Sequence, residues 1–233
     1  EAGDLLISGA ANSSVLLTGV NTYSGTTTVS TGVTLTAGES GLGHTENLLV
    51  SGKYVNSGAN TIGGLTVDNS GSLVLNPDTT LTINELVEAE SSTIAGALSG
   101  TGTILLANDG VGLTISSSNS SFGGTLILGE ANGAGVLTTI TNADALGSGT
   151  VEFGSSGSTF AVDADAAATI RNNFSGSGTI TVDLGSGTNA FVFATDSTHL
   201  VSGSDLNLTN ASYSLDSEQN AAMAGRLDIT GGA

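Results

Sequence analysis

The chain of 233 residues contains no cysteine, no tryptophan and a single proline. Without cysteine, neither a disulfide scaffold nor a cysteine-ligated zinc site can form. Only 3 side chains are basic against 21 acidic ones, so the net charge is −18. So few cations exclude a polybasic surface for nucleic acid or for an anionic membrane. No apolar run reaches the roughly 18 residues of a membrane span.

The remaining composition predicts a folded chain. Charged residues make up only 10% of the sequence and hydrophobic residues 38%, whereas disordered segments combine high charge with low hydrophobicity. Glycine is frequent, with 35 residues. The mixture of Thr, Ser, Asn and Gly with few cations is typical of an exported surface protein.

Hydrophobic residues alternate with polar ones over short stretches, which indicates β-strands. Residues 65–68 (LTVD), 73–75 (LVL) and 81–83 (LTI) are examples, and Asn, Gly, Ser, Pro and Asp separate them as turn formers. A sandwich needs longer strands joined by hairpins, and a propeller needs recurrent aromatics, which are only 4% here. We therefore expect an all-β chain, and a solenoid in particular.

Internal repeats support the solenoid. Residues 94–104 (IAGALSGTGTI) align without a gap with residues 170–180 (IRNNFSGSGTI), at an offset of 76 (170 − 94), and Tyr23 aligns with Phe122 at an offset of 99 (122 − 23). The difference, 23 (99 − 76), is in the range of one solenoid coil, which suggests that one copy has an extra coil. Roughly ten coils of this length fit the chain, in a rod about 50 Å long.

Three runs resemble a known family. Residues 21–29 (NTYSGTTTV), 145–151 (ALGSGTV) and 174–180 (FSGSGTI) are similar to the autotransporter-associated repeats of Gram-negative autotransporter passenger domains. The resemblance covers most of residues 20–185. It implies a right-handed parallel β-helix, exported through the periplasm and outer membrane to the bacterial surface, in an adhesin or self-associating protein with a part in biofilms and virulence. It also implies a tether through a C-terminal β-barrel outside these residues.

We expect residues 1–233 to form a single β-helix unit, with an atypical or capping coil at residues 186–233. The chain begins with Glu1-Ala2-Gly3 and not with methionine, so we expect a processed product or an excised piece of a passenger. The absence of cysteine suits a chain threaded unfolded through a pore.

Strand alternation predicts which side chains point inward. Between residues 26 and 30, Thr27 and Val29 should point into the coil. A second set of aliphatic residues should do the same: Val33, Leu35, Leu65, Val67, Leu73, Leu75, Leu81 and Ile83. The outward side chains are then mostly threonines, and we predict that they form a polar ladder for binding: Thr26, Thr28, Thr34, Thr36, Thr66, Asp68, Thr80 and Thr82.

Residues suited to catalysis are scarce, so we expect no enzyme, no cofactor and no metal. His44 and His199 are far apart, and neither has an evident catalytic partner. Arg171 occupies a variable repeat position, which indicates a surface residue. Asp163 and Asp165 could be a Ca²⁺ pair, but a solvated loop is favoured because the calcium-binding nonapeptide is missing. Recurrent Thr-x-Thr tripeptides are unevenly spaced, so no regular threonine lattice is expected.

The predicted function is therefore non-enzymatic adhesion or self-association. The expected partner is the chain itself on neighbouring cells, or a host surface or matrix component, and not nucleic acid or a membrane. One alternative is a structural stalk or a segment that nucleates passenger folding. Another is a polysaccharide-processing β-helix enzyme with Arg171 or Arg226 in an acidic groove.

Overall fold

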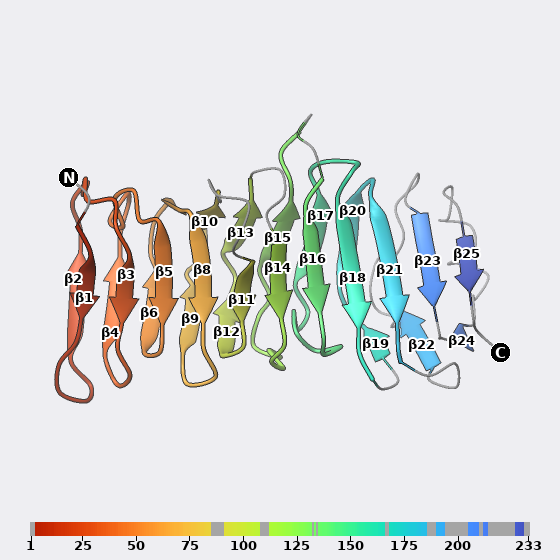
Figure 1. The fold of residues 1–233 in the computed structure, drawn as a ribbon, viewed down its shortest axis with the longest axis horizontal. Coiled ribbons are helices and arrows are strands. Elements are labelled where there is room, and N and C mark those ends of the chain that lie inside the picture. The colour runs from red at the N-terminus through yellow and green to blue at the C-terminus, as the bar shows by residue number, and fades with distance from the viewer. Residues whose placement is uncertain are drawn as a thin grey trace.

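The structure is a computed structural model. It describes residues 3–84, 91–107, 112–131, 133, 135–165, 168–185, 190–193, 205–209, 212–213 and 227–230. Every regular element in this described part is a β-strand, and the strands stack in parallel as a β-solenoid (Figure 1). The all-β, solenoid prediction is confirmed.

The strands belong to four sheets along the solenoid axis, which we call A to D. Sheet A contains β1 (Leu5–Ile7), β3 (Thr27–Val29), β5 (Asn47–Val50), β8 (Gly64–Val67), β11 (Ser92–Ile94), β14 (Gly112–Ile115), β16 (Leu137–Ile140), β18 (Thr159–Asp163), β21 (Thr179–Asp183), β23 (Asp205–Thr209) and β25 (Leu227–Thr230). Sheet B contains β2 (Ser14–Leu17), β4 (Thr34–Ala37), β6 (Lys53–Asn56), β9 (Ser72–Leu75) and β12 (Ala97–Gly100). Sheet C contains β7 (Asn60–Ile62), β10 (Thr80–Ile83), β13 (Thr103–Leu106), β15 (Thr125–Leu128), β17 (Thr150–Phe153) and β20 (Asn173–Gly176). Sheet D contains β19 (Ala168–Ile170), β22 (Ala190–Phe193) and β24 (Ser212–Tyr213).

Neighbouring strands of sheet A are one turn of the coil apart, and the turns differ in length. Leu48 is in register with Leu65, a turn of 17 residues (65 − 48), whereas Thr66 is in register with Thr93, a turn of 27 (93 − 66). The solenoid has about eight turns. The expected count of ten coils differs slightly from this number.

Inward side chains form the core. On sheet C, Leu81, Ile104, Leu126, Val151 and Phe174 follow one another in register, and each is at most 4% exposed. All of the aliphatic residues predicted to point inward are buried, together with Thr27 and Val29. Burying one such side chain contributes roughly 1.5–3 kcal/mol. Because each coil covers the next, the stability of the solenoid depends on adjacent coils.

The internal repeat of residues 94–104 and 170–180 corresponds to a corner of the coil. It does not indicate an extra coil, as the sequence had suggested. Leu98 of the first copy lies in β12 of sheet B, whereas the aligned Phe174 lies in β20 of sheet C. The two copies thus occupy different sides of the coil, so their offset does not indicate an extra coil. What they share is a corner: Gly100 (φ 100°) and Gly176 (φ 76°) both end a strand in the left-handed region, where glycine is favoured.

Buried asparagines connect the coils at other corners. Asn119 Oδ1 accepts the Leu98 backbone N–H at 2.7 Å, and Asn119 Nδ2 donates to the Ala145 carbonyl at 2.9 Å, so one side chain joins three coils. Asn60 Oδ1 accepts the Leu42 backbone N–H at 3.1 Å in the same way. These amides satisfy backbone groups that no neighbouring strand pairs with and that would otherwise be buried without a partner.

We predict that Gly100→Ala destabilises the solenoid. A Cβ at Gly100 would overlap the Leu75 carbonyl oxygen of the preceding coil, and the positive φ adds strain of about 1–2 kcal/mol. Urea unfolding should show a loss of at least about 2 kcal/mol. Gly19→Ala is the control, because a Cβ there meets no atom within 4 Å. Equal stability of the two variants would contradict this prediction.

Replacing the bridging amide of Asn119 should also destabilise the fold. In Asn119→Ala, the Leu98 N–H and the Ala145 carbonyl lose buried partners, at a cost of about 1–3 kcal/mol for each unsatisfied group. Thermal unfolding followed by circular dichroism should show a clear drop in Tm. The exposed Asn69 provides the matched control, and Asn69→Ala should leave the Tm nearly unchanged.

Candidate binding surface

Outward side chains of successive coils lie in register and form continuous files. The central file of sheet A has one residue on each strand from β1 to β21: Leu6, Thr28, Leu49, Thr66, Thr93, Thr114, Thr139, Ala161 and Thr181. Strands in a sheet are about 4.8 Å apart, so this file is an almost unbroken row of hydroxyls and methyls about 40 Å long. No member of the file is charged.

Sheet C has a threonine file of its own. Thr80, Thr103, Thr125 and Thr150 lie in register on four successive coils, and Asn173 follows. All five side chains are half-buried and point away from the core. Two sides of the solenoid therefore carry a ladder of the same residue type.

The predicted ladder residues point outward, as expected, but they lie on three different faces of the molecule. All eight are half-buried or exposed. Thr26, Thr28, Thr66 and Asp68 belong to sheet A or its margins. The other four are divided between sheet B, with Thr34 and Thr36, and sheet C, with Thr80 and Thr82. The eight residues thus do not make one continuous surface.

The threonine ladder of sheet A was not found from the sequence. Thr66, Thr93, Thr114 and Thr139 are on four successive strands, yet their spacings in the chain are 27 (93 − 66), 21 (114 − 93) and 25 (139 − 114). The uneven spacing had argued against a regular threonine array. In space the residues are neighbours, because turns of different length return the chain to the same strand register.

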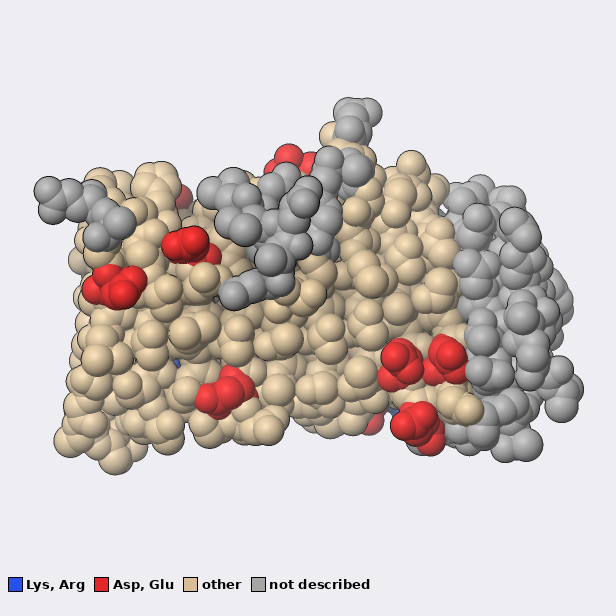
Figure 2. Space-filling model, viewed as in Figure 1, with Lys and Arg blue, Asp and Glu red and all other residues tan. Residues whose placement is uncertain are grey.

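Acidic residues lie beside the central file and not within it. We define the edge file as the outward residues two positions further along each strand: Ser30, Ser51, Asp68, Ala95, Ser116, Thr141, Asp163 and Asp183. Figure 2 shows red atoms above and below a tan region of this face. The central file from β1 to β21 is therefore uncharged, although the chain has a net charge of −18.

The carboxylate of Asp68 is held by four hydrogen bonds. It accepts hydrogen bonds from the Ser51 hydroxyl of the preceding coil, from the Ser70 hydroxyl at 2.7 Å and from the Ser70 and Gly71 backbone N–H groups at 2.8 and 3.0 Å. The Ser51 hydroxyl, followed by the Ser70 hydroxyl, lowers the pKa of the Asp68 carboxyl below its usual value. The charged carboxylate is thus part of the turn that follows β8.

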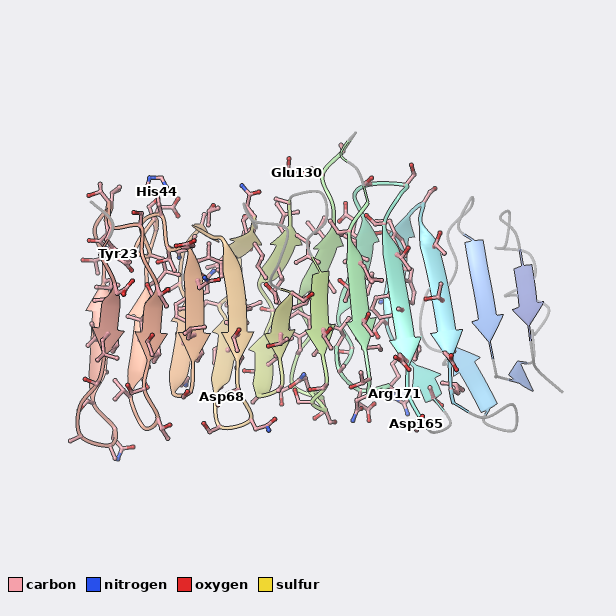
Figure 3. All side chains as sticks on the ribbon, viewed as in Figure 1. Tyr23, His44, Asp68, Glu130, Asp165 and Arg171 are labelled. Atoms are coloured by element: carbon pink, nitrogen blue, oxygen red, sulfur yellow. The ribbon has the colours of Figure 1, made fainter. Side chains whose placement is uncertain are left out.

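The other candidate residues are dispersed. In Figure 3, His44 and Glu130 lie at one edge of the view, whereas Asp68, Asp165 and Arg171 lie at the opposite edge. His44 and Arg171 are exposed. His199 and Arg226 lie outside the described residues.

The two aspartates considered for Ca²⁺, Asp163 and Asp165, are exposed. Within the described ranges, no three His, Cys, Asp or Glu side chains form a group that could hold a metal ion. The same part of the chain includes no helix that is both long and apolar enough to cross a membrane.

Comparisons with known proteins leave the chain without a family assignment. No family model, no curated protein and no solved structure matches it.

We predict that Asp68 makes stability depend on pH. Because its pKa is lower in the folded state, Asp68 stabilises the fold above the ordinary aspartate pKa of about 3.9, and this contribution is lost as the pH falls through the folded-state pKa. Asp68→Asn should therefore lower the Tm at pH 7, and the difference from the parent chain should shrink below about pH 4. Glu152→Gln, at an exposed outward position of sheet C, is the control. A difference that stays constant from pH 7 to pH 3 would contradict this account.

Proposed function

We propose that this chain is part of a non-enzymatic bacterial surface protein of the autotransporter passenger type, and that it acts through self-association. The observation that carries the proposal is the pair of threonine files on sheets A and C, which present the same polar groups coil after coil. Hydroxyls both donate and accept hydrogen bonds, so a surface made of them can pair with another copy of itself.

A rigid solenoid with the same outward residues on successive coils can form many weak contacts at once. One threonine–threonine contact contributes little, but many contacts along one rod form together, and many rods on one cell raise the effective concentration further. The neutral central file supports this mechanism, because it brings no like charges into direct contact between two copies that, with −18 each, repel one another at long range. Right-handed winding of the coil stays a prediction, in line with the strong general preference for right-handed crossovers between parallel strands.

A stalk is the second candidate function, and the uneven turn lengths favour it. Turns of 17 to 27 residues show that coils of different size are accepted in one solenoid. A stalk should keep its function when one whole coil is deleted, whereas an adhesive surface should lose activity when the deleted coil belongs to its threonine file. The glycan-processing alternative remains a prediction that an assay with uronate polymers, with and without Ca²⁺, would test.

Self-association should strengthen with salt. The charge repulsion between two copies extends over about 30 Å at 0.01 M ionic strength but only about 8 Å at 0.15 M. Beads coated with the protein should therefore clump more at 0.15 M than at 0.01 M salt, and soluble protein should inhibit the clumping. Sedimentation velocity should show the same trend. Beads that stay dispersed at every salt concentration, or clump equally at all of them, would contradict the proposal.

A further inference from the structure

We propose that sheet A is the self-association face, and that two copies meet there with their solenoid axes antiparallel. This inference rests on the proposed function and specifies its surface. The two-fold axis would lie parallel to the strands, between β11 and β14, so that the central file of one copy faces the central file of the other. A two-fold interface of this kind uses the same patch on both copies.

The central file is complementary to itself in this arrangement. A rotation about an axis between β11 and β14 reverses the order of the coils, so that β8 faces β16 and β5 faces β18. The order of residues from Thr28 to Thr181 is Thr, Leu, Thr, Thr, Thr, Thr, Ala, Thr. Each threonine thus faces a threonine, and Leu49 faces Ala161.

The leucine–alanine pair makes this register specific. Leu49 is one of five large hydrophobic side chains that are exposed in the described part of the chain, at 38%, and its side chain is larger than those of its threonine neighbours in the file. Ala161 is the smallest side chain of the file. Facing leucine and alanine side chains have about the same combined height as two facing threonines. The distance between the two sheets can therefore be the same along the whole file.

The edge file provides the charge argument. In the same register, no aspartate of the edge file faces another aspartate. The facing pairs between the two copies are Asp68 with Thr141, Asp163 with Ser51 and Asp183 with Ser30. Each carboxylate thus meets a hydroxyl-bearing side chain in place of a second carboxylate, and the hydroxyls of Thr141 and Ser30 can donate a hydrogen bond to it. If the axis passed through β14 instead, Asp68 would face Asp163, and two like charges would meet. If the axis passed through β11, Leu49 would face Thr139, and the leucine–alanine pair would be lost.

The size of the face predicts a weak pair. Nine strands about 4.8 Å apart, each about four residues wide, give roughly 500 Å² per copy, below the roughly 800 Å² typical of a stable interface. We therefore expect dissociation constants in the micromolar range or weaker. A weak pair of this kind becomes effective when many copies are displayed on one surface.

A size swap tests the register. Ala161→Leu places a leucine against Leu49 of the other copy and should weaken dimerisation by about tenfold, whereas adding Leu49→Ala to it restores the large–small pair and should restore dimerisation to within about twofold. Sedimentation equilibrium measures the dissociation constants, and circular dichroism verifies that each monomer is folded. If the double variant is no better than Ala161→Leu alone, the register is wrong.

A cross-linking experiment tests the face independently, and the natural absence of cysteine makes it specific. Copies with Thr66→Cys mixed with copies with Thr139→Cys should be joined by a short thiol-reactive cross-linker, because these positions face each other. Each variant alone should cross-link far less, since its own cysteines are about 14 Å apart along the rods. Thr125→Cys, on sheet C, is the control partner for Thr66→Cys and should not react with it.

The outcomes separate this inference from the function it rests on. If the chain stays monomeric at every concentration and salt, self-association fails and the face fails with it. If the chain associates but the sheet A substitutions and cross-links have no effect, self-association stands and the sheet A face is overturned. Association that Thr125→Asp, on sheet C, disrupts but Thr114→Asp does not would assign the contact to sheet C.

Discussion

The structure depends on the stacking of each coil's apolar interior on the interior of the next. Parallel hydrogen bonding between strands one turn apart keeps residues of the same kind above one another, as in the file from Leu81 to Phe174 on sheet C. A single coil has too little neighbouring surface to bury these side chains, so the ordering entropy of each coil is offset only when adjacent coils are present.

The fold also requires hydrogen-bond partners for the backbone groups at the corners of each coil. A chain that turns after every three to five residues leaves backbone groups outside the strand ladder, and these must find partners or reach water. Buried amides such as that of Asn119 supply partners on two other coils. Glycines such as Gly100 supply the left-handed conformation in places where the preceding coil leaves no room for a side chain. Asn and Gly are therefore frequent for structural reasons.

Because stability comes from the interior and the corners, the outward positions are free to take another role. They are filled mainly by threonine, a residue that favours β-strands and can both donate and accept hydrogen bonds. From β1 to β21, the acidic groups of sheet A lie at its edges, where Asp68 is held by serine hydroxyls and backbone N–H groups. A neutral central band on an acidic molecule is the feature from which we infer the contact between copies.

The amino-acid sequence by itself determined the strand alternation, and with it the inward and outward positions from Thr27 to Ile83, because the side-chain period of a strand is local. It did not determine which outward residues are neighbours. Thr66 and Thr93 are adjacent although 27 residues separate them, whereas the similar segments beginning at Ile94 and Ile170 lie on different sides of the coil. Turn lengths vary, so only the hydrogen-bonded register between distant strands decides which residues meet on a common face.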